Sequence, residues 1–151
     1  MRLLACMALL LGVPVASMAN SFESTCGAAT FQVVAENRGH PLDNKYELYS
    51  APSKDGERKL LYTSDVGGWF YAECVAGADN RKLLLFQAFC GGSACVENKY
   101  GIVDPSDLKL LVVPPSENKG NSKAALAVLK TKRVPYLPRS KTAFCCNDKP
   151  H

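Results

Sequence analysis

The residue types that could do chemistry gather in one short stretch, which holds two cysteines and a serine. Cys90-Gly91-Gly92-Ser93-Ala94-Cys95 places Ser93 among small residues, between cysteines that an oxidising compartment would join. A serine or cysteine nucleophile needs a histidine as its base. The chain has two: His40, in a turn before Pro41, and His151, its last residue. The stretch also lacks the second glycine of a nucleophile elbow. These residues favour recognition over catalysis, so we expect no enzyme activity.

Metal and acid–base chemistry receive little support from the sequence. Cys90, Cys95, Cys145 and Cys146 have a tolerable spacing for a structural metal, but disulfides are favoured in an exported chain. Solvated carboxylates are the default in turns, and most of the following acidic residues fall in expected turns: Glu47, Asp55, Glu57, Asp65, Glu73, Asp79, Glu97, Asp104 and Asp107. We therefore expect no metal and no cofactor.

The first residues have the composition of a secretory signal peptide. Arg2 supplies the positive start, Leu3–Ala16 is apolar apart from one glycine and one proline, and Ser17-Met18-Ala19 gives a cleavage site before Asn20. The apolar run is too short to span a bilayer. We therefore expect residues 1–19 to be a signal peptide and residues 20–151 to form a single periplasmic domain without membrane insertion.

The cysteines that remain after residues 1–19 predict three disulfides, since Cys6 leaves with the signal peptide. Cys90–Cys95 is the obvious local pair. Adjacent cysteines rarely bond to each other, so Cys26 and Cys74 are each expected to pair with one of Cys145 and Cys146, in an order that the sequence leaves open. These two bridges would close long loops and contribute about 3–5 kcal/mol each in the chain-entropy model.

Alternating apolar and polar residues separated by turn signals predict an antiparallel β protein. The expected strands are 30–34, 45–50, 58–62, 69–74, 82–89, 99–103 and 108–113. Asp55-Gly56 marks a hairpin turn. An alanine-rich segment predicts one short helix over 123–130, capped by Asn121 or Ser122. Trp69, Phe70, Tyr71 and Phe86 are expected to fill the core.

A weak internal repeat suggests that hairpins recur along the chain. Lys45-Tyr46 and Lys59-Leu60-Leu61-Tyr62 resemble Lys99-Tyr100 and Lys109-Leu110-Leu111-Val112 in composition and order. We therefore expect a mainly β fold, with antiparallel hairpins in a meandering or propeller-like sheet arrangement, one short C-terminal helix and three disulfides.

The charge pattern argues against nucleic-acid binding. The chain has 18 Lys and Arg residues against 14 Asp and Glu, a net charge of +4. The basic residues are scattered and form no stripe of the kind that phosphate backbones require. No oligomeric state is specified.

Three segments in order carry a resemblance to a known family. They are the strand Asp79–Phe86, the small-residue loop Phe89–Ala94 and the basic tail Pro138–Cys145. Together with the signal peptide, they are similar to the periplasmic immunity proteins that neutralise peptidoglycan amidases of type VI secretion. The resemblance covers roughly residues 69–146.

The resemblance implies a protein partner and a mode of inhibition. Such proteins protect a cell by plugging the cleft of a cognate amidase, which houses a Cys-His pair. A serine-bearing loop enters that cleft and hydrogen-bonds the histidine. The matching position is Ser93, with Gly91, Gly92 and Ala94 as partner-binding neighbours. This chain departs from the family in the cysteines at both ends of the loop.

Other interpretations of the sequence stay open. Cys90–Cys95 could merely staple a β-turn. The chain could also be another periplasmic binding module, such as a lysozyme inhibitor or a small-ligand-binding β domain. An exported hydrolase would require a histidine beside Ser93 or a free thiol.

Overall fold

The computed structural model describes residues 20–36, 38, 44–51, 57–64, 68–90, 98–116 and 119–137. Within these ranges the chain forms strands and one short helix: β1 (Asn20–Cys26), β2 (Ala29–Glu36), β3 (Lys45–Ala51), β4 (Lys59–Ser64), β5 (Gly68–Ala76), β6 (Lys82–Cys90), β7 (Lys99–Asp104), β8 (Lys109–Val112) and α1 (Ser122–Leu129). The predicted mainly β fold with one helix is confirmed. The predicted signal peptide lies outside the described residues.

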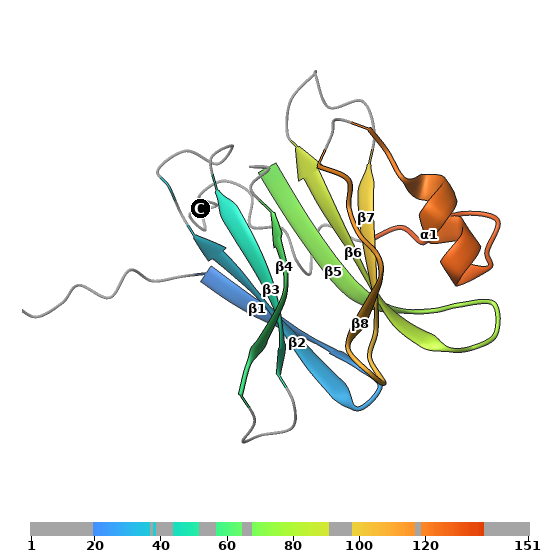
Figure 1. Cartoon of the computed structure of the whole chain (residues 1–151), viewed down its shortest axis with the longest axis horizontal. Coiled ribbons are helices and arrows are strands. Elements are labelled where there is room, and N and C mark those ends of the chain that lie inside the picture. Colours follow the sequence, from blue (N-terminus) through green and yellow to red (C-terminus); the bar gives the residue numbers. More distant parts are fainter. Residues whose placement is uncertain are drawn as a thin grey trace, which may run out of the picture.

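The strands form two antiparallel meanders that stack in layers. Sheet A has the order β1-β2-β3-β4, and sheet B has the order β5-β6-β7-β8. Sheet A packs on one face of sheet B and α1 covers the other, so three layers follow one another across Figure 1. In the described ranges, no helix has the length and hydropathy needed to cross a membrane.

Strand β1 is an element that the sequence analysis missed. It is an edge strand of sheet A, and among its residues only Phe22 and Cys26 are large apolar or buried positions. The signal that could have found it is the pair Gly27-Ala28, a two-residue hairpin connection with glycine first. Gly27 has a φ of +62°, which glycine adopts without steric penalty.

The weak sequence repeat corresponds to the last hairpin of each sheet. Hairpin β3–β4 and hairpin β7–β8 both shift register after the fourth residue of their first strand, between Leu48 and Tyr49 and between Ile102 and Val103. The pairs beside the shift also correspond: Leu48 with Tyr62 and Tyr49 with Leu60, Ile102 with Val112 and Val103 with Leu110. The repeat is therefore present in the backbone pairing.

Matching residues of the two hairpins point into different cores. Tyr46 and Leu48 of β3 point into the core between the sheets. Their counterparts Tyr100 and Ile102 of β7 point away from sheet A, into a second core beneath α1. The corresponding faces of the two sheets therefore point in the same direction. Sheet B is buried on both of its faces.

Aromatic rings fill the core between the sheets. Phe70 and Phe86 stack with centroids 5.4 Å apart, Tyr46 stacks on Phe70 at 5.6 Å, and Tyr62 lies 5.1 Å from Phe86. The predicted core positions of Phe70 and Phe86 are confirmed. Tyr71 is buried in the second core, and Trp69 packs against it while partly exposed.

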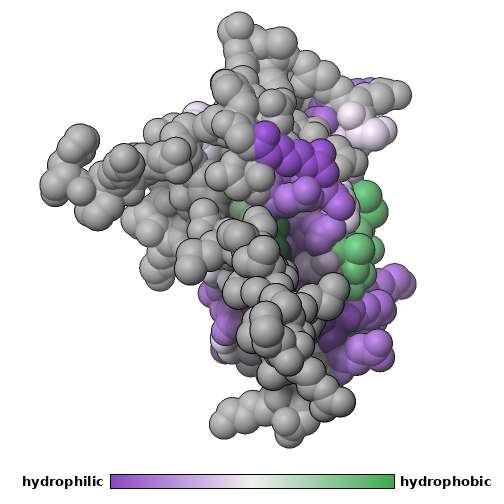
Figure 2. All heavy atoms as spheres, turned by 90° about the vertical axis from the view of Figure 1, so that its left-hand side faces the viewer, coloured by the Kyte–Doolittle hydropathy of each residue, from purple (hydrophilic) through white to green (hydrophobic). Residues whose placement is uncertain are grey.

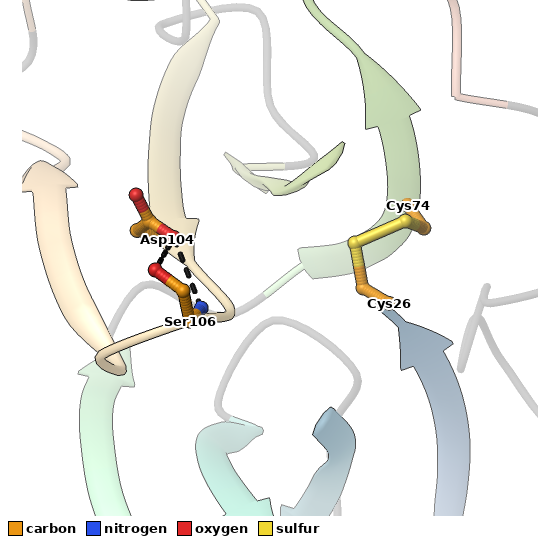
Figure 3. The surroundings of a disulfide bond; sticks show 4 residues. All are labelled: Cys26, Cys74, Asp104 and Ser106. Atoms are coloured by element: carbon orange, nitrogen blue, oxygen red, sulfur yellow. Dashed lines mark hydrogen bonds between the residues drawn. A yellow bond between two sulfur atoms is a disulfide. The ribbon is translucent and has the colours of Figure 1, made fainter. Parts of the chain in front are cut away.

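The predicted pairing of Cys26 and Cys74 with the C-terminal cysteines is wrong. Cys26 and Cys74 bond to each other, with their Cα atoms 5.0 Å apart (Figure 3). Cys26 ends β1, the strand that the sequence analysis missed, and β1 lies beside β5, which carries Cys74. The spacing of the cysteines along the sequence could not show that β1 and β5 lie side by side. Cys145 and Cys146 lie outside the described residues, as does the side chain of Cys90, so their partners stay open.

A turn of sheet B is built close to this disulfide (Figure 3). The Oγ and backbone N–H of Ser106 donate to Asp104 at 2.7 and 3.0 Å. These two hydrogen bonds, with the nearby Arg81 guanidinium, hold the pKa of Asp104 below its ordinary value. Asp104 thus serves the β7–β8 turn, as the sequence analysis expected of turn carboxylates.

Replacing Cys26 and Cys74 by alanine is expected to lower the free energy of unfolding by about 4 kcal/mol, because the crosslink spans 48 residues. Urea denaturation of the oxidised protein measures the difference. Proteolytic mapping without reduction should recover one peptide joining Cys26 to Cys74. A peptide joining Cys26 to Cys145 or Cys146 would contradict the arrangement.

Gly101→Ala is expected to destabilise the protein by about 1–3 kcal/mol. A Cβ at Gly101 would lie 1.9 Å from the Phe86 ring, which stacks over this glycine in the middle of sheet B. Thermal or urea unfolding provides the measurement. The matched test is Phe86→Leu with Gly101→Ala: if the clash is the cause, the double variant loses less stability than the two single losses added together. Additive losses would contradict it.

Candidate functional site

The predicted partner-binding residues Gly91, Gly92, Ser93 and Ala94, together with Cys95, lie outside the described residues. The structure instead describes the two strands that carry them. Strand β6 ends at Cys90 and β7 begins at Lys99, so the candidate stretch connects neighbouring strands at one end of sheet B.

The strands at the base of this connection are largely enclosed by their neighbours. Strand β6 pairs with β5 on one side and β7 on the other. The four residues Leu83–Phe86 have 0% exposure each, alternating between the inter-sheet core and the core under α1. The apolar run thus does form a strand covered on both faces, as its sequence predicts.

Asn121 ties the region around α1 to β7. Its side-chain carbonyl accepts the Tyr100 N–H and its amide donates to the Tyr100 carbonyl, both at 2.7 Å. The same amide donates to the Val113 carbonyl at 3.2 Å. Asn121 is the residue before α1, yet its side chain makes no capping bond to the helix. The predicted cap is therefore a bridge between β7, the end of β8 and α1.

A hollow of about 280 Å³ opens on the outer face of sheet B, beside α1 and near the β6–β7 connection. It is lined by Trp69, Tyr71, Gln87, Asn98, Tyr100, Val134, Pro135, Tyr136 and Leu137. The pairing register explains why three of these residues meet. Tyr71 lies opposite Gln87, and Gln87 lies opposite Tyr100, so they form a row across β5, β6 and β7.

The ends of sheet B differ in charge. At the end away from the β6–β7 connection, Asp79 and Asp104 lie in turns next to Arg81 and Lys130. The Arg81 backbone N–H lowers the pKa of Asp79, with a contribution from Lys130. At the other end, the described residues that line the hollow are all uncharged. Nearby, the buried Lys99 donates to the Ser116 carbonyl at 3.4 Å.

The outer face of sheet A carries a charged cluster. Glu47 accepts from Lys45 at 2.8 Å and from the Tyr49 hydroxyl at 2.5 Å, and these bonds lower the pKa of Glu47 and raise that of Tyr49. The Arg58 guanidinium lies over the Tyr49 ring. Glu47 thus lies in β3, within the strand that the sequence predicted over 45–50. The described surface on this side is mainly hydrophilic (Figure 2).

The described residues include no group of three or more side chains that could hold a metal ion. Their carboxylates at Asp79, Asp104 and Glu47 are each engaged with neighbours that stabilise a turn or a strand. Two features of the described residues lie together at one end of sheet B: the base of the β6–β7 connection and the hollow next to it.

Sequence reasoning missed the hollow because its residues come from separate strands. It assigned Trp69 and Tyr71 to the core, and it gave no role to Gln87, Asn98, Tyr100 or Tyr136. A polar Gln87 after an apolar run was the available signal, since Leu83 and Leu85 precede it on the same strand face. The strand register that brings these residues together cannot be read from spacing alone.

Comparisons with known proteins add no family to the fold and the hollow described above. No protein-family model, curated protein or solved structure matches this chain.

Asn121→Ala is expected to lower the free energy of unfolding by about 1–3 kcal/mol, because it leaves the backbone groups of Tyr100 without their partner. Chemical denaturation of the variant provides the measurement. Asn121→Asp is the matched control, since it keeps the acceptor for the Tyr100 N–H but loses both donations, so an intermediate loss is expected. Equal stability of the wild type and Asn121→Ala would contradict the bridging role.

Proposed function

We propose that this protein is a periplasmic immunity protein that binds and inhibits a cell-wall amidase. In this proposal the β6–β7 connection, with Ser93 at its centre, enters the active-site cleft of the amidase. Support comes from the likeness of Asp79–Phe86, Phe89–Ala94 and Pro138–Cys145 to such immunity proteins, and from the way the fold carries the connection.

The observation that carries the proposal is the support under the connection. Its flanking strands, β6 and β7, are the central strands of sheet B and are buried on both faces. Binding residues are commonly placed on loops that a rigid scaffold positions. A segment held at both ends by such strands loses less conformational entropy on binding than a free one, which favours affinity.

The chemistry of the segment fits a narrow cleft. Glycine, serine and alanine have the smallest side chains, so the backbone can approach the walls of the cleft closely. A serine hydroxyl both donates and accepts, so Ser93 can pair with either protonation state of a catalytic histidine. In this proposal the Cys90–Cys95 disulfide holds the segment in its bound shape.

Ser93→Trp tests the insertion directly. A tryptophan would not fit the cleft, so binding of the cognate amidase should weaken by at least about 100-fold. Isothermal titration calorimetry measures the affinity, and hydrolysis of peptidoglycan measures inhibition. Ser106→Trp is the matched control, because Ser106 is exposed in the turn at the opposite end of β7.

The outcomes separate insertion from a general loss of structure. Ser106→Trp should bind and inhibit as the wild type does, and circular dichroism should show both variants folded. Unchanged affinity of folded Ser93→Trp would overturn the insertion of this segment. Equal weakening by both variants would also overturn it, since the effect would then not depend on position.

A further inference from the structure

The hollow on the outer face of sheet B has the composition of a binding site. Trp69, Tyr71, Tyr100 and Tyr136 bring four aromatic rings to it, and Gln87 and Asn98 bring two carboxamides. Its volume of about 280 Å³ lies near the lower end of the range of small-ligand sites, roughly 300–1,000 Å³. The space suits one ring-sized group.

The polar groups of the hollow are partly uncommitted. Gln87 lies in the middle of the row formed with Tyr71 and Tyr100, and within the described residues its carboxamide has no hydrogen-bond partner. Asn98 donates to the Tyr100 hydroxyl at 3.2 Å. That bond uses the oxygen of Tyr100 as acceptor and leaves its proton to be donated. The floor therefore offers donors and acceptors at fixed positions.

The stacking of the sheets explains why this surface is there. Tyr100 and Ile102 of sheet B correspond to Tyr46 and Leu48 of sheet A. In sheet A, the face that carries these residues is covered by sheet B. On sheet B the same face is covered by α1 and by residues 134–137. The hollow lies where residues 134–137 meet the strands of sheet B. Tyr136 borders it with 80% exposure, as an aromatic ring that the fold itself leaves in solvent.

The chemistry of the lining selects the ligand. The described side chains of its lining are all uncharged, so they do not compensate the desolvation of an anionic or cationic ligand. Aromatic faces carry partial negative charge and attract the weakly positive C–H groups on the face of a sugar ring. Carboxamides and phenols both donate and accept, which matches hydroxyl groups that do the same.

From these observations we propose that the hollow binds one ring of a neutral sugar, with an aromatic side chain against its C–H face and Gln87, Asn98 and Tyr100 bonded to its hydroxyls. This binding would be independent of amidase inhibition, since it uses the outer face of sheet B and not Ser93.

Trp69 makes the proposal directly measurable. It is the one tryptophan of the chain, so intrinsic tryptophan fluorescence reports on the hollow alone. The protein is titrated with the neutral oligosaccharides chitotriose and maltotriose up to about 10 mM, which covers dissociation constants in the millimolar range and below. A saturable change in intensity or wavelength with at least one of them is expected.

Two variants and one control place the binding. Gln87→Leu should weaken binding at least tenfold by removing the central carboxamide. Gln32→Leu makes the same change on β2 of sheet A and should leave binding unchanged. Tyr136→Ala alters an exposed ring that the fold does not need, so it should weaken binding while the protein stays folded even if Gln87→Leu does not fold.

Nuclear magnetic resonance of the side-chain amides completes the test. Saturable shifts of the Gln87 and Asn98 NH₂ signals, with the Gln32 signal unmoved, would support the proposal even if fluorescence changed little. No saturable response to either oligosaccharide in both measurements would overturn it. Binding that Tyr136→Ala and a folded Gln87→Leu leave intact would overturn it as well, because the sugar would then lie elsewhere.

Discussion

The constraint on which this structure depends is that sheet B must be covered on both faces. The run Leu83–Phe86 has no polar face, so β6 is stable only with apolar layers on either side. Sheet A supplies one layer, through Tyr46 and Tyr62, whose rings pack on Phe70 and Phe86 of sheet B. The helix α1 supplies the other, and Asn121 bonds its start to β7. The Cys26–Cys74 bridge then joins the first strand of sheet A to the first strand of sheet B.

This arrangement determines where recognition can occur. The described outer face of sheet A is mainly hydrophilic and carries the paired Lys45 and Glu47, while the far end of sheet B has turns that Asp79 and Asp104 stabilise. The remaining end of sheet B combines a firmly held strand pair with an uncharged aromatic hollow. Both proposals concern this end. One uses the segment that β6 and β7 carry, and the other uses the face of the same strands.

The sequence predicted most of the fold because its strands are strongly patterned. The run in β6, the alanine-rich helix and the Lys-Leu-Leu strands were each readable locally, and even the weak repeat corresponds to matching registers in β3–β4 and β7–β8. The predictions that failed concern which strands and side chains lie next to one another. Strand β1 is a polar edge strand with a weak pattern, and without it Cys26 could not be placed next to Cys74. Gln87 and Tyr100 likewise became neighbours only through the pairing of β6 with β7.

The central claim is that this end of sheet B binds an amidase through the β6–β7 connection. Hydrogen–deuterium exchange of the protein, alone and saturated with the proposed cognate amidase, measures this most directly. The account predicts slower exchange in residues 91–98 and unchanged exchange in β3 and β4, which lie in the other sheet. Protection confined to sheet A, with residues 91–98 exchanging as in the free protein, would contradict it.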